Sequence, residues 1–188
     1  MLSKTSFFSL LLLLLLATAC HLTQTTTSSN PSEGGSSAAA NYKITGPANA
    51  VAYVEQFKRI AVSESLRTGI PASIKLAQGI LESGYGSSTL AKKANNHFGI
   101  KCGMGWSGKT MQYKGSCYRV FKNGNDAYKE HSNFLTNSNR YQELFKLKRT
   151  DYKGWARGLR KAGYATNPQY PSKLIELIER YKLQNYDK

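Results

Sequence analysis

Residues 71–86 read PASIKLAQGILESGYG, and this stretch decides how the rest of the chain is interpreted. Pro71 suits the first helical position, where the N–H that proline lacks would be unpaired anyway. The apolar residues that follow recur at the spacing of one helix face, and Gln78 and Glu82 lie four residues apart beside it. Gly84 ends the run. The stretch predicts a mostly apolar helix that delivers the carboxyl group of Glu82 to a turn.

Glu82 is the candidate for acid chemistry. Gly84 and Gly86 follow it, so the backbone at this turn can approach a ligand closely. A partly desolvated carboxyl group has a raised pKa, which a general acid needs if it is to protonate a glycosidic oxygen. A solvated glutamate at a helix end has the same local sequence, so the helix alone does not separate the two readings.

Helical patterns of apolar residues also occur on both sides of this stretch. They cover residues 47–67, 88–93, 127–136, 151–161 and 172–182. Residues 98–121 are different, because Gly, Tyr, Thr, Trp and Val occur there without a helical period, which predicts a β-ribbon with turns at 103–108 and near Gly115. The fold class expected is α+β, a helical domain with one small β-lobe.

The first nineteen residues resemble an export signal. Lys4 precedes the apolar segment 7–16, which is shorter than the roughly 20 residues of a spanning helix. Residues 16–20 read LATAC and resemble a bacterial lipobox, which predicts a lipid on Cys20 that anchors the protein to an envelope membrane. A plain secretory signal with a coincidental cysteine is the alternative.

Residues 20–43 are expected to form the lipidated cysteine and a flexible tether, and residues 44–186 the folded domain. Nine of the 21 residues from 21 to 41 are Ser or Thr, and no periodic apolar face occurs among them. Such a segment cannot bury enough surface to offset its ordering entropy.

The basic charge belongs to the folded domain. The chain holds 26 Lys+Arg and 11 Asp+Glu, a formal charge of +15, and residues 42–188 hold 25 and 10 of these. An anionic partner is expected. Nucleic acid is not the expected one, because no DNA- or RNA-binding motif occurs and the export signal removes the chain from the cytoplasm. The three cysteines lack zinc-site spacing, so we expect no metal and no cofactor.

Several blocks together resemble one enzyme family. Residues 71–91 and 95–101 closely resemble the signature of the glucosaminidase family of bacterial cell-wall hydrolases, glycoside hydrolase family 73. Later blocks of the family follow in the same order, at residues 118–121, 131–135, 140–141 and 162–170. The resemblance covers residues 47–186. It implies a lysozyme-like helical fold with a β-lobe, and hydrolysis by this endo-β-N-acetylglucosaminidase-type domain of the β-1,4 bond after N-acetylglucosamine in peptidoglycan, with Glu82 as the acid.

The resemblance also implies site residues. Tyr164, in the sequence GYAT, matches the family's cleft tyrosine and is expected to act with Glu82 in catalysis. Sugar faces stack on aromatic rings, and amides and hydroxyls hydrogen-bond to sugars. On these grounds the expected substrate-binding residues are Gln78, Ser83, Tyr85, Asn96, Phe98, Tyr118 and Tyr170.

One departure from the family bears on mechanism. Related sequences often carry Glu where this chain has Ser116, and no Asp or Glu occurs between Glu82 and Asp126, whereas seven Lys or Arg do. Asp126 and Glu130 come next, near or on the following helix. Either the 2-acetamido group of the substrate acts as the nucleophile, or the protein is a weakly active or noncatalytic lipoprotein that binds peptidoglycan.

Two cysteines flank the predicted ribbon. An exported protein reaches an oxidising compartment, so a disulfide between Cys102 and Cys117 is expected to staple the lobe, with two free thiols as the alternative. We expect an exported monomer that is anchored in the cell envelope and acts on glycan strands.

Overall fold

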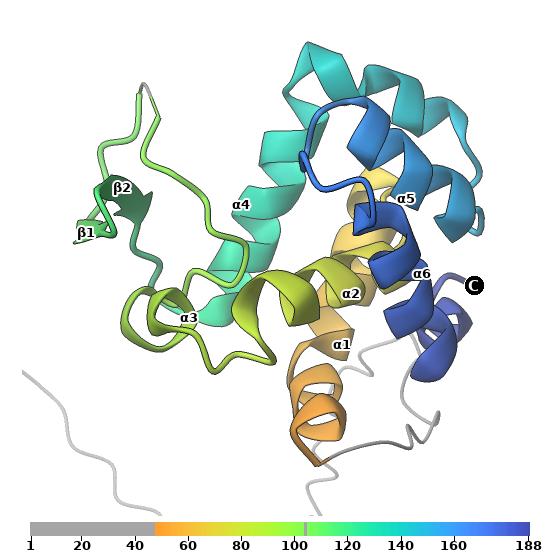
Figure 1. Cartoon of the computed structure of the whole chain (residues 1–188), viewed down its shortest axis with the longest axis horizontal. Helices are drawn as coiled ribbons and strands as arrows, with labels where there is room; N and C mark the ends of the chain where they lie inside the picture. Colours follow the sequence, from red (N-terminus) through yellow and green to blue (C-terminus); the bar gives the residue numbers. More distant parts are fainter. Residues whose placement is uncertain (1–47, 104) are drawn as a thin grey trace, which may run out of the picture. The chain divides into compact units, whose positions relative to one another are not determined.

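The computed structural model describes residues 48–103 and 105–188 (Figure 1). The predicted signal peptide, the lipidation site Cys20 and the tether lie outside these residues. The described part is mostly helical with one two-stranded antiparallel sheet, so the predicted α+β class is confirmed. None of its helices is both long and apolar enough to cross a membrane.

Helix α2 (Ala72–Ser83) lies in the middle of the helical part. It contacts four other elements: α1 (Ala48–Thr68), α5 (Tyr152–Lys161), α6 (Tyr170–Arg180) and the 3-10 helix η2 (Leu183–Tyr186). Ten of its twelve residues are buried. Pro71 stands one position before the predicted place, as the cap rather than the first helical residue. Gly84 ends the helix in the left-handed conformation (φ 54°) and donates its N–H to the carbonyl of Ile80.

Helix α1 (Ala48–Thr68) packs against α2 and α4 through aromatic rings. Phe57 stacks on Tyr128 of α4 with ring centroids 5.0 Å apart. The hydroxyls of Tyr53 and Tyr128 approach α2 at Gly79, where a Cβ atom would collide with both. The glycine in the middle of α2 is therefore required by close packing.

The β-lobe follows the short helix α3 (Thr89–Ala94) and consists of β1 (Thr110–Tyr113) and β2 (Ser116–Arg119). The strands pair antiparallel, with Thr110 opposite Arg119 and Tyr113 opposite Ser116. A disulfide joins Cys102 to Cys117, with the two Cα atoms 5.5 Å apart. Both strands of the ribbon thus lie within residues 98–121, where it was predicted. The disulfide links β2 to Cys102 in the segment before β1.

The remaining elements complete the helical part (Figure 1). They are α4 (Gly124–Thr136), η1 (Asn139–Lys146), α5 (Tyr152–Lys161), α6 (Tyr170–Arg180) and η2 (Leu183–Tyr186). Helix α6 begins two residues earlier than predicted, with Pro171 in its first turn. The two 3-10 helices were not predicted, since short 3-10 turns do not show a 3.6-residue apolar period.

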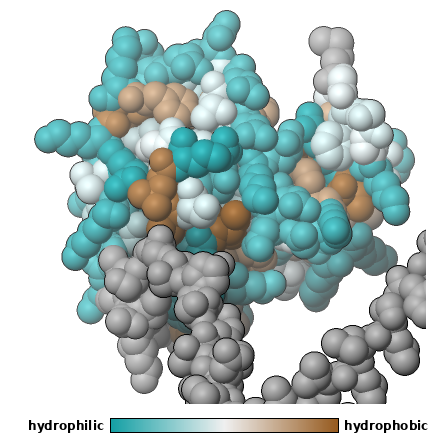
Figure 2. All heavy atoms as spheres, turned by 180° about the vertical axis from the view of Figure 1, so that it is seen from behind, coloured by the Kyte–Doolittle hydropathy of each residue, from teal (hydrophilic) through white to brown (hydrophobic). Residues whose placement is uncertain are grey.

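The residues after η2 fasten the start of α2. Asp187 accepts hydrogen bonds from the backbone N–H of Ser73 (2.8 Å) and from its hydroxyl (2.6 Å). Burial raises the pKa of Asp187 to about 6, although these hydrogen bonds oppose the shift. Seen from behind, the described surface is mostly hydrophilic with separate hydrophobic patches (Figure 2).

Candidate active site

A cleft of about 740 Å³ separates the end of α2 from the β-lobe. Its walls come from α2, the segment after α3, strand β2, α4, η1 and the loop before α6. The lining residues are Glu82, Leu90, Phe98, Gly99, Ile100, Lys101, Gly103, Tyr118, Arg119, His131, Phe134, Arg140, Tyr141, Tyr164 and Ala165. This volume lies within the range of sites that hold small ligands or a few sugar units.

Glu82 stands on the α2 wall of the cleft. Its side chain is exposed at the cleft surface, and Tyr170 donates a hydrogen bond of 3.2 Å to its Oε1 atom. The surrounding protein displaces enough water to raise the pKa of the carboxyl, while the hydrogen bond from Tyr170 lowers it and only partly cancels the shift. A carboxyl group that keeps its proton to higher pH can act as a general acid.

Behind Glu82, one buried amide orients Tyr170. The Nε2 atom of Gln78 donates a hydrogen bond of 3.0 Å to the hydroxyl of Tyr170, which then has its proton free for Glu82. Gln78 is fully buried, and its Oε1 atom has no hydrogen-bond partner among the described residues. The structure therefore places Gln78 behind the cleft wall, where it supports Tyr170 and does not reach a substrate.

Tyr164 lies beside this pair and lines the cleft. Its ring stacks on Tyr170 at 5.7 Å between centroids, and its hydroxyl lies 3.0 Å from Nε2 of His131. Burial and the nearby charge of Glu82 hold the pKa of Tyr164 well above its usual value, so the phenol stays protonated. Glu82, Tyr164 and Tyr170, three of the predicted site residues, thus meet at one place.

The opposite wall is aromatic and basic. Tyr118 and Arg119 of β2 line it together with Lys101, and Arg119 forms an ion pair with Glu130 of α4. The Arg119 guanidinium also lies 4.7 Å from the ring centre of Trp106. Arg119 therefore holds the lobe against α4, whereas the exposed Lys101 is left free to meet an anionic ligand.

Glu82 is the only carboxylate among the described residues that line the cleft. Asp126 and Glu130 line a separate cavity of about 320 Å³ beside Trp106. Ser116 shares a face of β2 with the cleft residue Tyr118, two positions further on, but does not itself line the cleft. The described residues that line the cleft therefore include no second carboxylate, as expected from the lack of acidic residues between Glu82 and Asp126.

The other predicted substrate-binding residues divide into two groups. Phe98 lines the cleft, stacked on His131 at 4.1 Å. Ser83 and Asn96 are buried and bond to neighbouring backbone: Ser83 accepts from the N–H of Gly86, and Asn96 donates to the carbonyl of Ile100.

Tyr85 is absent from the cleft lining. Its hydroxyl lies 3.2 Å from that of Tyr181, and its φ is 57°. The structure therefore gives Ser83, Asn96 and Tyr85 supporting positions rather than contact positions.

The described residues hold no group of three His, Cys, Asp or Glu side chains able to bind a metal ion. His97 packs on Phe57 with ring centroids 4.7 Å apart, and burial lowers its pKa to about 4. It packs among the aromatic rings of the core.

Sequence reasoning missed several residues around the cleft. Arg140, Tyr141, Phe134 and His131 line it, and Lys75 lies behind His131. A signal for Lys75 did exist, since a lysine in an otherwise apolar helix, seven residues before Glu82, falls on the same helix face as the acid.

Known proteins share sequence with this chain. The family model for the glucosaminidase domain, described as mannosyl-glycoprotein endo-beta-N-acetylglucosaminidase, matches residues 58–183. The exo-glucosaminidase LytG of Bacillus subtilis is 34% identical over 128 residues, which cover 61% of this chain and 45% of LytG. The peptidoglycan hydrolase FlgJ of Vibrio parahaemolyticus is 27% identical over 144 residues, 69% of this chain and 46% of FlgJ. The chain spans about half the length of these relatives.

Solved structures show the same fold. A peptidoglycan hydrolase from Sphingomonas sp. A1 superposes with a TM-score of 0.62 at 29% identity, over 72% of this chain and 91% of that one. The glycoside hydrolase domain of Salmonella typhimurium FlgJ gives a TM-score of 0.61 at 27% identity, over 71% and 88%. The predicted relationship is confirmed: the chain belongs to the glucosaminidase family of peptidoglycan hydrolases.

Proposed function

We propose that the protein is an endo-β-N-acetylglucosaminidase that cleaves the β-1,4 bond after N-acetylglucosamine in peptidoglycan, with Glu82 as the general acid. One observation carries this proposal: a single carboxyl group with a raised pKa stands on the cleft wall, and Tyr170 fixes its orientation. Glycoside hydrolysis requires such a proton donor at the leaving oxygen.

The nucleophile is the 2-acetamido group of the substrate. Glu82 gives its proton to the glycosidic oxygen, the bond from that oxygen to the anomeric carbon breaks, and the acetamido carbonyl oxygen bonds to that carbon. Water then opens this cyclic ion and returns a proton to Glu82, so the anomeric configuration is retained. The proposal is supported by the absence of a second carboxylate from the described cleft lining and by Tyr164, which can hydrogen-bond to the charged centre.

The cations of the cleft fit the same substrate. Lys101 and Arg140 line it, and both are exposed. Peptidoglycan peptides carry free carboxylates, which these two side chains can meet. Since the relatives include peptidoglycan hydrolases, we propose that this protein acts in the cell envelope as an exported monomer. The sequence LATAC at residues 16–20 is the reason for proposing that a lipid on Cys20 holds it to a membrane.

The experiment is hydrolysis of purified sacculi, followed as new reducing ends and by the size of the released fragments. An endo-acting enzyme releases oligosaccharides of many lengths with N-acetylglucosamine at the reducing end and retained configuration by NMR. Release of disaccharides alone would identify an exo-acting enzyme. N-acetylmuramic acid at the new ends would contradict the proposed bond.

A second function is favoured by the single carboxylate together with the basic cleft: a weakly active or noncatalytic lipoprotein that binds peptidoglycan. Both functions predict sacculus binding that weakens as salt rises, because screening reduces charge attraction. Only the enzyme also releases reducing ends. Binding without release, at protein concentrations that saturate the sacculi, would establish the second function in place of the first.

A further inference from the structure

Lys75 is a buried cation in the helix that carries Glu82. It is fully inaccessible to solvent, and its Nζ atom has three polar neighbours on α4. They are the carbonyl of Tyr128 (2.9 Å), the hydroxyl of Ser132 (2.7 Å) and the Nδ1 atom of His131 (3.2 Å). An ammonium group has three N–H donors and no acceptor, so these neighbours use its full capacity.

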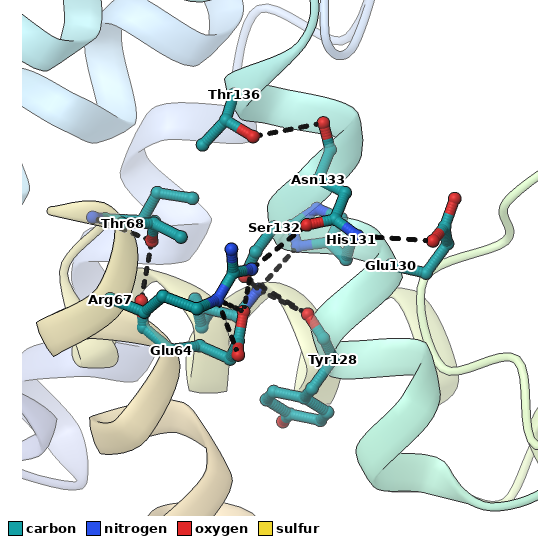
Figure 3. A network of polar contacts seen from close by, with 11 residues as sticks. Glu64, Arg67, Thr68, Tyr128, Glu130, His131, Ser132, Asn133 and Thr136 are labelled. Atoms are coloured by element: carbon teal, nitrogen blue, oxygen red, sulfur yellow. Dashed lines mark hydrogen bonds and ion pairs between the residues drawn. The ribbon is translucent and has the colours of Figure 1, made fainter.

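Charges on α1 surround this lysine. Glu64 lies almost fully buried on α1 and forms an ion pair with Arg67, which also donates a hydrogen bond to Asn133 of α4 (Figure 3). Burial lowers the pKa of Lys75 to about 7, the Glu64 charge raises it, and the Arg67 charge lowers it further. A buried lysine without a structural or functional role is rare, because the cost of desolvating its charge is high.

The three neighbours of Lys75 determine the tautomer of His131. The hydroxyl of Ser132 has its own acceptors, the carbonyl of Tyr128 (3.2 Å) and the carboxylate of Glu64, so its oxygen is free to accept from Lys75. In its protonated form Lys75 has no lone pair and can only donate to Nδ1 of His131, 3.2 Å away. With Lys75 protonated, Nδ1 therefore carries the lone pair and the ring proton of His131 sits on Nε2. Burial and the Lys75 charge hold the pKa of His131 well below its usual value, so the ring is neutral.

The chain of hydrogen bonds ends in the cleft. The Nε2–H group of His131 points to the hydroxyl oxygen of Tyr164, 3.0 Å away. That oxygen acts as the acceptor, so the hydroxyl proton of Tyr164 is left for another partner. Tyr164 lines the cleft with Glu82, and its phenol does not ionise at neutral pH.

We propose that Lys75 and His131 are positioning residues that hold the Tyr164 hydroxyl as a hydrogen-bond donor toward an oxygen of the substrate. The part that concerns the substrate rests on the proposed function. One face of α2 thus supports both cleft tyrosines. Gln78 donates a hydrogen bond to Tyr170, and Lys75 acts on Tyr164 through His131. Two tyrosine protons therefore face the cleft, one toward Glu82 and one toward the ligand.

The first test reads the tautomer in the free protein, without any activity. Long-range proton–nitrogen correlation NMR distinguishes the two neutral forms of histidine, and His131→Gln identifies the signal among the three histidines of the chain. We expect the Nε2–H form in the wild type, and loss of its dominance in Lys75→Met. A wild-type ring protonated on Nδ1 would overturn the proposal, whether or not the protein hydrolyses sacculi.

The second test is a double-mutant cycle on sacculus hydrolysis. Lys75→Met and Tyr164→Phe are each expected to lower kcat about tenfold, and the double variant to be no slower than Tyr164→Phe. Losses that multiply would mean that Lys75 does not act through Tyr164. Lys58→Met is the matched control: Lys58 is also largely buried, pairs with Glu55 on α1 (2.7 Å) and is absent from the cleft lining, so activity should persist.

A third pair of variants covers the case in which Lys75→Met does not fold. A glutamine at position 131 has both an acceptor for Lys75 and a donor for Tyr164, whereas a leucine has neither. His131→Gln is expected to stay within about threefold of wild-type kcat and His131→Leu to lose about tenfold or more. Equal loss in two variants with equal thermal stability would overturn the relay. If no wild-type hydrolysis occurs, the proposed function fails, and the NMR result alone decides the tautomer.

Discussion

The two walls of the cleft are built in opposite ways. On the α2 wall, Glu82 is oriented by Tyr170, which is in turn held by the buried Gln78. On the β-lobe wall, none of the described residues that line the cleft is an acid. This wall presents Tyr118 and Lys101, and it is held by a disulfide and by the ion pair of Arg119. Under the proposed function, proton transfer belongs to the helical wall and contact with an anionic glycan to the lobe.

The largest effect is expected at the acid. Glu82→Gln keeps the shape of the side chain and removes the proton donor, so the release of reducing ends from sacculi should fall about 10²-fold or more. Glu143→Gln is the matched control, because Glu143 is exposed on η1 and pairs only with Lys146. If muropeptide release is unchanged in folded Glu82→Gln, the two walls do not divide the chemistry as described.

The second largest effect is expected on thermal stability, from loss of the disulfide of the β-lobe. Cys102→Ser removes the disulfide, and a bridge of this loop size typically contributes about 2 to 4 kcal/mol to the free energy of unfolding. The melting temperature measured by circular dichroism should fall in the variant only without reductant. With reductant present, variant and wild type should melt together. Equal melting without reductant would show that the bridge does not stabilise the lobe.

A smaller effect is expected in the pH dependence. The hydrogen bond from Tyr170 favours ionised Glu82, so Tyr170→Phe should raise the pKa of Glu82 further. A general acid acts in its protonated form, and a higher pKa preserves that form to higher pH. In a plot of kcat against pH, the alkaline limb should therefore move to higher pH.

Tyr152→Phe provides the control, because its hydroxyl makes the same kind of bond to the carboxylate of Glu179 outside the cleft. The role of Tyr170 would be contradicted if the alkaline limb moved to lower pH in Tyr170→Phe, or if it moved by the same amount in Tyr152→Phe.

The smallest effect tests whether the lobe lacks an acid that it needs. Ser116→Glu places a carboxyl group on the strand face of Tyr118. If the acetamido group of the substrate is the nucleophile, turnover should stay the same or fall. A large gain, with the product anomer followed by NMR, would show instead that a second carboxylate is required.

The sequence predicted the positions of helices and strands better than it predicted which side chains contact one another. Pro71 and Gly84 lie at the two ends of α2 because both act through local backbone geometry, and the absence of a helical period in residues 98–121 is equally local. The burial of Gln78 depends on Tyr170, which lies 92 residues away, and helical spacing does not show which partner will cover a face. Lys75 was overlooked for a similar reason, since a lysine is expected at the surface unless its distant acceptors are known.

The hydrogen bonds that Asp187 accepts from Ser73 have a consequence for folding during translation. The two residues are 114 positions apart, so the N-terminus of α2 receives this partner only after almost every other described residue has been made. Contacts of such long range form late in folding, because the loop between them must close first. The N-terminus of α2, the helix that carries Glu82, therefore lacks this partner until the last residues of the chain have been synthesised.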